Sequence, residues 1–236
     1  MSKYSADAHE VQMKILRELL LSDSSAHKTL VSASGLSSDH ADFHIKQLVS
    51  NGFVEHIPKT YGEYRLTRSG KEYANRMDTD DSVIEKQPKL SVLLDIVNDE
   101  GLVLYQERIK QPYYGYWGRP TGKISWGETT IEAAKRELYE ETGLEADLTV
   151  EGIYHKLDYD NDGKLLEDKY FILVSGKNPR GKLIDKTDGQ RNVWMSEEDF
   201  AKKERSFGNL DDIKHLIDSD GHFFAEKKYT YPSEDY

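Results

Sequence analysis

The segment GKISWGETTIEAAKRELYEETGL, residues 122–144, constrains the fold more strongly than any other part of this chain. Thr129 is followed three residues later by Glu132, which is a capping-box pattern for the start of a helix. Gly143 stands where the end of a helix favours a residue in the left-handed conformation. Local chemistry therefore predicts a helix from about residue 130 to residue 142 with both ends defined.

Three glutamates of this predicted helix share one face. Glu137, Glu140 and Glu141 stand at positions i, i+3 and i+4, so their carboxylates fall within a single turn. Such like charges repel one another, and a cation is therefore expected beside them. Clustered carboxylate oxygens suit Mg²⁺ or Mn²⁺, which also accept phosphate oxygens of a substrate. The alternative, a merely solvated acidic face, explains neither Gly122 nor Arg136.

Read from Gly122, the segment has the pattern G-x5-E-x7-R-E-L-x-E-E-x-G-L. This pattern is similar to the signature box of the Nudix (MutT-like) hydrolase family, and the resemblance covers about residues 88–218. It implies an α/β/α sandwich around a mixed sheet. It also implies an Mg²⁺-dependent or Mn²⁺-dependent enzyme that cleaves a phosphoanhydride bond of a nucleoside diphosphate-linked compound, of nucleotide or nucleotide-sugar type, by metal-assisted attack of water.

The resemblance assigns roles to the residues of the box. It implies a metal site formed by Glu137, Glu140 and Glu141, with Glu128 in its outer shell. Glu137 and Glu141 are also expected to be catalytic, because Glu137 or a loop carboxylate helps to deprotonate the attacking water. Arg136 is expected to hold a box glutamate in place by a charge-assisted hydrogen bond.

Two segments outside the box carry further candidates. Asp188 precedes a tryptophan-containing strand, where many relatives place another catalytic carboxylate; Asp185 is the second choice, and a simple surface Asp-Gly turn is the alternative. Trp117 and Arg119, just before the box, are predicted to bind the substrate. Trp117 would stack on a base, although aromatic residues beside a sheet edge are packing residues at least as often.

The first 80 residues have a different pattern, with three helices followed by a hairpin. We expect helices at His9–Leu21, at Lys28–Ser34 and after the Ser37-Ser38 cap, and strands at Phe53–Ile57 and Glu63–Leu66. This order resembles the winged helix-turn-helix family of MarR or ArsR type over about residues 8–78, most closely at Leu48–Val54 and Tyr64–Gly70. The resemblance implies that the third helix enters the major groove of DNA.

The DNA contacts that this resemblance implies are Lys46 and Gln47 on the third helix, with Lys59 and Arg65 on the wing. Asp39 and Asp42 on the same helix would repel phosphates. Two readings therefore stay open: this domain binds DNA, or it mediates dimerisation or the binding of another partner.

The organisation predicted from these patterns is an α+β chain of two domains. Residues 1–78 form the winged helix-turn-helix domain, 79–88 a linker poor in apolar residues, and 89–236 the Nudix domain. Further strands are expected at Glu151–Tyr159, Lys169–Ser175 and Asn192–Met195, a hairpin from Leu90–Val97 and Leu102–Glu107, and helices at Glu197–Glu204 and Leu210–Ile217.

Charge and composition limit the function classes. The net charge is −11, yet residues 1–80 hold ten basic and eleven acidic side chains, so the acidity belongs to the second domain. The absence of cysteine excludes a thiolate nucleophile and a cysteine zinc site. Apolar stretches are short and the start of the chain lacks the regions of a signal peptide, which predicts a cytoplasmic protein without membrane association.

Three functions follow as alternatives. The first is an active hydrolase with an accessory N-terminal domain, which the complete box favours. The second is a Nudix-related transcriptional regulator whose C-terminal domain senses a nucleotide ligand and whose winged helix binds DNA. The third combines both, with hydrolysis removing the effector. The sequence leaves the oligomeric state open, a homodimer included.

Overall fold

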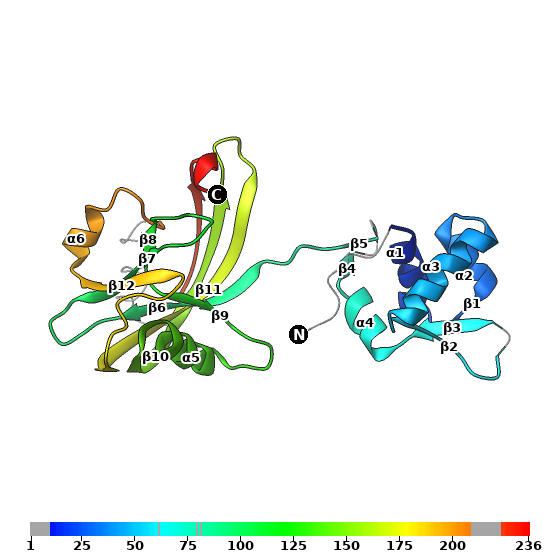
Figure 1. Cartoon of the computed structure of the whole chain (residues 1–236), viewed down its shortest axis with the longest axis horizontal. Helices are drawn as coiled ribbons and strands as arrows, with labels where there is room; N and C mark the ends of the chain where they lie inside the picture. Colours follow the sequence, from blue (N-terminus) through cyan, green and yellow to red (C-terminus); the bar gives the residue numbers. More distant parts are fainter. Residues whose placement is uncertain (1–9, 61, 79, 81, 209–222) are drawn as a thin grey trace. The chain divides into compact units, whose positions relative to one another are not determined.

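The computed structural model describes residues 10–60, 62–78, 80, 82–208 and 223–236. Contacts divide the chain into two compact units, Met1–Gln87 and Pro88–Tyr236 (Figure 1). Within the described residues no helix is long and apolar enough to cross a membrane.

The first unit has three helices, a small sheet and a fourth short helix. Its elements are α1 (Glu10–Leu20), β1 (Ser25–Ala26), α2 (His27–Ser34), α3 (Ser38–Ser50), β2 (Val54–His56), β3 (Glu63–Leu66), α4 (Arg68–Ala74), β4 (Met77–Asp78) and β5 (Val83–Ile84). The strands form one antiparallel sheet of order β1-β3-β2 and a separate β4-β5 pair. β5 lies inside the segment 79–88 for which only a linker is predicted, and β1 has no clear signal in the sequence.

Apolar side chains at helical spacing form the core of this unit. Ile15 and Leu16 of α1 meet Leu30 of α2 and Leu48 of α3, and all four are fully buried. Gly70 of α4 is required by a close approach, because a Cβ atom there would lie 1.9 Å from the carbonyl oxygen of Phe53. This contact fixes the start of α4 against the entry to β2.

The second unit contains two sheets and the predicted glutamate helix. Its elements are β6 (Lys89–Ile96), β7 (Val103–Arg108), β8 (Trp117–Gly118), β9 (Thr121–Lys123), α5 (Thr130–Thr142), β10 (Leu144–Tyr159), β11 (Leu165–Gly181), β12 (Gln190–Met195), α6 (Glu197–Ala201), β13 (Phe223–Thr230) and the 3-10 turn η1 (Ser233–Asp235). The larger sheet has the order β13-β10-β11-β6-β9, and the smaller one the order β12-β7-β8.

The larger sheet is mixed, as predicted. β10 runs parallel to β13, and β11 runs parallel to β6, while β10–β11 and β6–β9 are antiparallel. The helix predicted at Leu210–Ile217 lies outside the described residues, and so does the helical layer that it would add to a sandwich.

The hairpin predicted from 90–97 and 102–107 is wrong beyond its turn. β6 and β7 share a single bridge, between Val97 and Val103, and then enter different sheets. The physical reason is the burial of β6: its last six residues are all buried, so the strand needs partners along both edges, which β11 and β9 supply.

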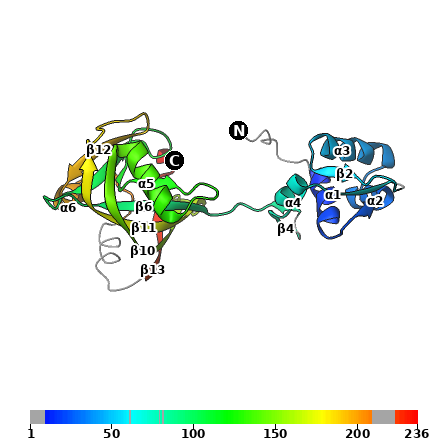
Figure 2. The same ribbon diagram turned by 90° about the horizontal axis from the view of Figure 1, so that it is seen from below.

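The helix α5 packs against one face of the larger sheet (Figures 1 and 2). Ala134 and Leu138 are completely buried against Val92 and Leu94 of β6 in one apolar cluster. Glu141 follows Ala134 by seven residues, about two helical turns, and therefore lies on the same side of α5 as this cluster, whereas Glu140 is turned by roughly 100° towards solvent.

We predict that Leu138→Ala destabilises the second unit by about 2–5 kcal/mol, because the substitution opens a cavity in a closed core. Urea unfolding followed by tryptophan fluorescence measures this unit alone, since Trp117, Trp126 and Trp194 all belong to it. The control is Tyr139→Ala, the next residue of α5, whose side chain is 60% exposed and whose loss should cost about 0.5 kcal/mol or less. Equal losses in both variants would contradict this packing.

Candidate active site

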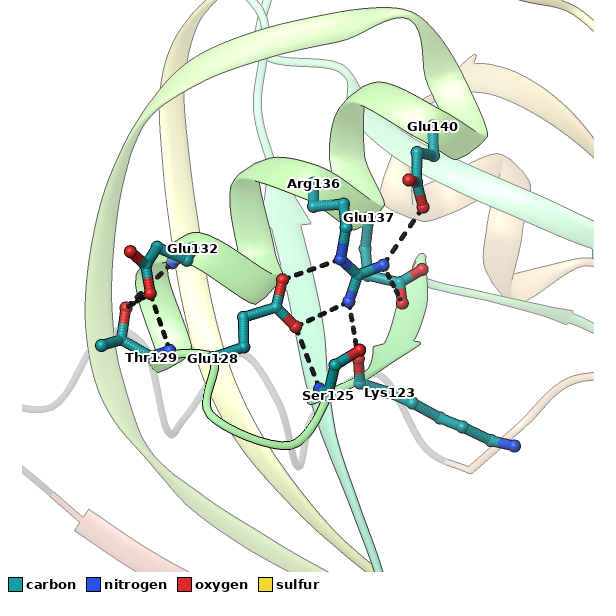
Figure 3. A network of polar contacts seen from close by, with 8 residues as sticks. All are labelled: Lys123, Ser125, Glu128, Thr129, Glu132, Arg136, Glu137 and Glu140. Atoms are coloured by element: carbon teal, nitrogen blue, oxygen red, sulfur yellow. Dashed lines mark hydrogen bonds and ion pairs between the residues drawn. The ribbon is translucent and has the colours of Figure 1, made fainter. Parts of the chain in front are cut away.

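Both ends of α5 are held as the sequence predicts. The hydroxyl oxygen of Thr129 accepts a hydrogen bond from the backbone N–H of Glu132 over 3.4 Å, and the Glu132 carboxylate accepts one from the N–H of Thr129 over 2.9 Å (Figure 3). Gly143 ends the helix with φ at 73°. The capping box and the glycine stop therefore fix which residues face the sheet and which do not.

Arg136 is the centre of a network of glutamates (Figure 3). Its Nε and Nη2 donate to the two carboxylate oxygens of Glu128 over 2.7 and 2.8 Å. Its Nη1 donates to Glu137 over 2.8 Å and to Glu140 over 3.1 Å, and Nη2 also donates to the carbonyl oxygen of Lys123 over 3.0 Å. One guanidinium thus ties the loop before α5 to two glutamates of the helix.

This network shifts the pKa of its members. Hydrogen bonds from Arg136, followed by one from the backbone N–H of Ser125, lower the pKa of the Glu128 carboxyl to about 2. The same hydrogen bonds, that with Glu128 foremost, raise the pKa of Arg136. Glu128 is therefore an ionised anchor for Arg136 over the whole physiological range.

Gly122 gives Glu137 its place. A Cβ atom on Gly122 would lie 2.0 Å from the carboxyl carbon of Glu137, so any other residue would displace that side chain. The Glu137 side chain is only 13% exposed and lies directly over the backbone of β9. The first glycine of the motif thus leaves room for its central glutamate.

Glu141 faces away from Arg136. It accepts a hydrogen bond from Nε2 of Gln106 on β7 over 3.0 Å. Burial raises the pKa of Glu141 above its usual value, and the neighbouring charge of Glu137 acts in the same direction, against the hydrogen bond from Gln106. Glu140 differs from both, since its side chain is 58% exposed.

The four predicted metal ligands do not converge on one point. Arg136 draws Glu128, Glu137 and Glu140 to itself, while Gln106 holds Glu141. Accordingly, no group of three or more histidine, aspartate or glutamate side chains in the described part of the chain is arranged to hold a metal ion. The chemistry of the donors nevertheless fits a hard divalent cation, because all four offer carboxylate oxygens.

Glu137 and Glu141 both open onto a cavity of about 530 Å³ within the second unit. Both sheets and α5 line it, and most of its charged residues are basic. The basic residues are Lys89, Arg108, Lys110, Arg119, Lys123, Lys156 and Lys169, and the acidic ones are Glu137, Glu141 and Glu167. In a chain with a net charge of −11, this concentration of basic side chains favours an anionic ligand.

The two predicted substrate-binding residues differ in position. Arg119 lines the cavity, but its Nε donates to the buried carboxylate of Asp95, and its guanidinium lies 5.3 Å from the ring centre of Tyr105. Trp117 is buried with Tyr105 and Phe200 in a separate apolar cluster and is not part of the cavity wall. Trp117 is therefore placed as a packing residue, the alternative to stacking on a base, because β8 turns its ring towards α6.

The loop carboxylates lie at the surface. Asp185 and Asp188 are both exposed, and neither belongs to the cavity wall, whereas Gly189 and Gln190 do. Gln190 also forms a hydrogen bond with Glu141, and this bond acts to lower the pKa of the Glu141 carboxyl. The loop therefore reaches the cavity through Gly189 and Gln190, the two residues that follow the predicted Asp188.

Several cavity residues are missing from the sequence-based prediction. Gln106 and Arg108 both line the cavity from β7, two positions apart and hence on one face of that strand. The alternation Leu104, Gln106, Arg108 is the signal that could have identified them. Their approach to α5, however, depends on the separation of β7 from β6.

In the first unit, α3 carries two of the predicted DNA contacts. Lys46 and Gln47 are exposed, and Gln47 accepts a hydrogen bond from Nε2 of Gln12 over 2.7 Å. Asp42 on the same helix bonds to Nε2 of His27 over 2.5 Å. Of these side chains, the carboxylate of Asp42 and the amide of Gln47 are thus engaged within the unit.

The other two predicted contacts lie on the β2–β3 hairpin. Lys59 is exposed in the connecting loop with φ at 66°, and Arg65 of β3 donates to Glu55 of β2 over 2.7 Å. Asp39, at the start of α3, is exposed.

A family model described as the NUDIX domain matches residues 87–214, more than half of the chain. The chain belongs to the Nudix family. Members of this family generally use divalent metal cations. The family match therefore agrees with the donor chemistry of the four box glutamates.

Individual relatives match shorter stretches. An RNA pyrophosphohydrolase from Erythrobacter litoralis is 53% identical over 53 residues, which are 22% of this chain and 32% of the relative. An ADP-ribose pyrophosphatase from Methanocaldococcus jannaschii is 32% identical over 82 residues, 34% of this chain and 48% of the relative. The chain thus spans about a third of the length of the first of these curated relatives and about half of the second.

Among solved structures, the MutT protein from Bacillus halodurans superposes with a TM-score of 0.51 at 21% identity. The superposition covers 63% of this chain and 93% of that protein. At this level of identity the likeness shows the fold of the second unit.

We predict that Arg136→Met raises the pKa of Glu128 from about 2 towards its ordinary value of 4.5, because the strongest hydrogen bonds to the carboxylate are lost. In the wild-type protein the ionised Glu128 carboxylate stabilises the folded state above pH 4.5. This contribution to the free energy of unfolding is lost as the pH falls towards about 2. Carbon-13 NMR titration of labelled glutamate side chains measures the change. Arg180→Met, which removes the partner of Asp147, is the control and should leave Glu128 unchanged. An unchanged pKa of Glu128 in Arg136→Met would contradict the network.

Proposed function

We propose that this chain is a Mg²⁺-dependent Nudix hydrolase that cleaves a phosphoanhydride bond of a nucleoside diphosphate-linked compound. The observation that carries the proposal is the position of Glu137 and Glu141, which open from a complete box onto a cavity with mainly basic walls. The names of the relatives, RNA pyrophosphohydrolase and ADP-ribose pyrophosphatase, support a pyrophosphate bond as the target.

Glu137, Glu140 and Glu141 would hold the Mg²⁺ or Mn²⁺ ion, with Glu128 in the outer shell. A bound metal ion would neutralise charge on the pyrophosphate and would lower the pKa of a water molecule bound to it. Arg136 binds Glu137 and Glu140, so it would compete with the metal for these carboxylates and would keep them close to the site.

The remaining chemistry belongs to the side chains of the chain itself. Glu137 or a loop carboxylate would accept a proton from the attacking water, and Gln106 would orient Glu141 by its hydrogen bond. Arg108, Lys110 and Lys123 line the same cavity and would bind the phosphate oxygens as their charge changes. Asp188 is a second candidate base, because the two residues after it belong to the cavity wall.

We predict that Glu137→Gln and Glu141→Gln each lower kcat by about 100-fold or more, because each removes a charged ligand from the catalytic metal. The assay is release of phosphate or nucleoside monophosphate from a panel of nucleotides in the presence of Mg²⁺. Glu145→Gln, an exposed glutamate at the start of β10, is the matched control.

Millimolar Mg²⁺ or Mn²⁺ should also raise the Tm of the wild-type protein, and do so less in the two variants, since the ion binds the folded state. Full activity in both variants would overturn the metal assignment.

We further propose that the first unit is a winged helix-turn-helix that binds DNA, the activity required of a transcriptional regulator that senses a nucleotide. The order of three helices and a hairpin, with β1 added to the sheet beside β3, supports this proposal. Lys46 on α3 and Lys59 in the hairpin loop are its exposed contacts. The competing proposal is dimerisation, which Phe43, an exposed aromatic residue on α3, supports.

If the first unit binds DNA, Asp39→Asn should tighten binding, because it removes an exposed negative charge from the start of α3. Lys46→Ala and Lys59→Ala should each weaken binding, and affinity should fall steeply with salt. Fluorescence anisotropy with a duplex at two salt concentrations measures both effects. Lys71→Ala, an exposed lysine on α4, is the control. No binding at low salt by the wild-type protein and by Asp39→Asn would favour the dimerisation module instead.

A further inference from the structure

Three lysines stand side by side across the larger sheet, at the end of the cavity away from the box. Lys156 of β10 is the register partner of Lys169 of β11, and Lys169 is the register partner of Lys89 of β6. All three line the cavity. We call them the lysine row. Like charges directly opposite one another destabilise a sheet, so the row is not explained by folding alone.

The carboxylates near the lysine row do not neutralise it. Lys156 donates to Asp158 over 2.5 Å, and Lys89 donates to Glu167 over 2.5 Å. Lys169 makes one ion pair within the described part of the chain, with the same Glu167 oxygen at 3.8 Å. Three ammonium groups therefore share two carboxylates, and positive charge is left over at Lys169.

Two members of the row, Lys156 and Lys169, are also largely removed from water. Lys156 is only 5% exposed, and burial lowers its pKa to about 8, against the attraction of Asp158. Burial likewise lowers the pKa of Lys169 below its usual value. Tyr231 accepts a hydrogen bond from Lys156 over 2.9 Å, and its ring centre lies 4.8 Å from the same ammonium group. Holding these cations partly buried costs free energy that a bound anion would return.

A buried hydroxyl group adds a donor at the same cavity. Tyr113 lines the cavity, is 2% exposed, and its hydroxyl has no hydrogen-bond partner among the residues that the structure describes. Burial raises the pKa of the Tyr113 hydroxyl, and the charges of Asp158 and Glu167, the two carboxylates of the row, act in the same direction. An unsatisfied buried hydroxyl is unfavourable unless a ligand completes it.

The lysine row and the box lie at different positions along β6. Glu137 packs on Gly122, whose partner on β6 is Val92. Lys89 precedes Val92 by three residues, a strand length of roughly 10 Å. Neighbouring phosphates share one bridging oxygen and lie much closer together. Burial lowers the pKa of Arg108, against the charges of Glu167 and Glu141, so this cavity residue interacts with a carboxylate of the row and with one of the box.

We propose that the lysine row, with the Tyr113 hydroxyl, is a second anion site that binds a phosphate group of the ligand remote from its pyrophosphate. The inference rests on the proposed function only for the position of the pyrophosphate at α5. It narrows the substrate class to pyrophosphate compounds that carry a further phosphate roughly 10 Å from the pyrophosphate, the strand length that separates Lys89 from Val92.

Binding of inorganic phosphate to the metal-free full-length protein tests the site directly. Isothermal titration should show that Lys169→Met and Lys89→Met each weaken binding by about tenfold, because each removes a charge-assisted hydrogen bond. Lys89 is half exposed, so its variant keeps the test valid if Lys169→Met does not fold. Lys177→Met, which replaces an exposed lysine on the same strand β11, should bind as the wild type does. Equal affinity in the wild type and both row variants would overturn the proposal.

Kinetics distinguish a phosphate of the substrate from free phosphate. With two nucleoside diphosphate-linked substrates that differ only in a terminal phosphate, the row variants should raise KM about tenfold for the phosphorylated one alone. An equal rise for both substrates would overturn the assignment to a substrate group. If no nucleotide is hydrolysed but phosphate binding still depends on the row, the anion site stands and the proposed function fails.

Discussion

Repulsion among glutamates within one helical turn is the constraint on which the second unit depends. The capping box and Gly143 fix α5 so that Glu137, Glu140 and Glu141 cannot move apart along the helix. Arg136 offsets the repulsion because it binds Glu137, Glu140 and Glu128. The remaining helix glutamate, Glu141, is held by Gln106. Because the guanidinium lies among carboxylates, the contacts that offset this repulsion also keep Glu128, Glu137 and Glu140 close to Arg136. Under the proposed function, the same charges would serve both the stability of α5 and the binding of a cation.

The cavity exists because β6 and β7 separate after one bridge at Val97 and Val103. A continued hairpin would have placed Gln106 and Arg108 in the sheet of β6. Instead β7 joins β8 and β12, and its inward side chains reach α5 from the opposite side. The space between the sheets then extends from Glu137 to the lysine row, and both sheets contribute basic residues to its wall.

Local chemistry made part of this predictable. The bounds of α5 follow from the capping box and Gly143 within one segment, and the structure has the helix at Thr130–Thr142. A box glutamate as partner of Arg136 is expected only from the resemblance to the Nudix box, and the room that Gly122 leaves for Glu137 is not predicted. The position of Trp117 and the separation of β6 from β7 could not be predicted, because tertiary pairing decides which face of a short strand is buried. The lysine row could not be predicted for the same reason. Its members are far apart in the sequence, and only the register of three strands brings them together.

The charge of the chain and the charge of the cavity have opposite signs, and this difference bears on selectivity. A net charge of −11 repels polyanions from the surface at long range, while the basic cavity attracts an anion that enters it. Salt screens the long-range repulsion strongly but has less effect on the contacts of Lys156, which is buried, and of Lys169, which is largely buried. The charges of the second unit thus favour a small anionic ligand over general binding of nucleic acid. The first unit is nearly neutral and lacks this long-range repulsion.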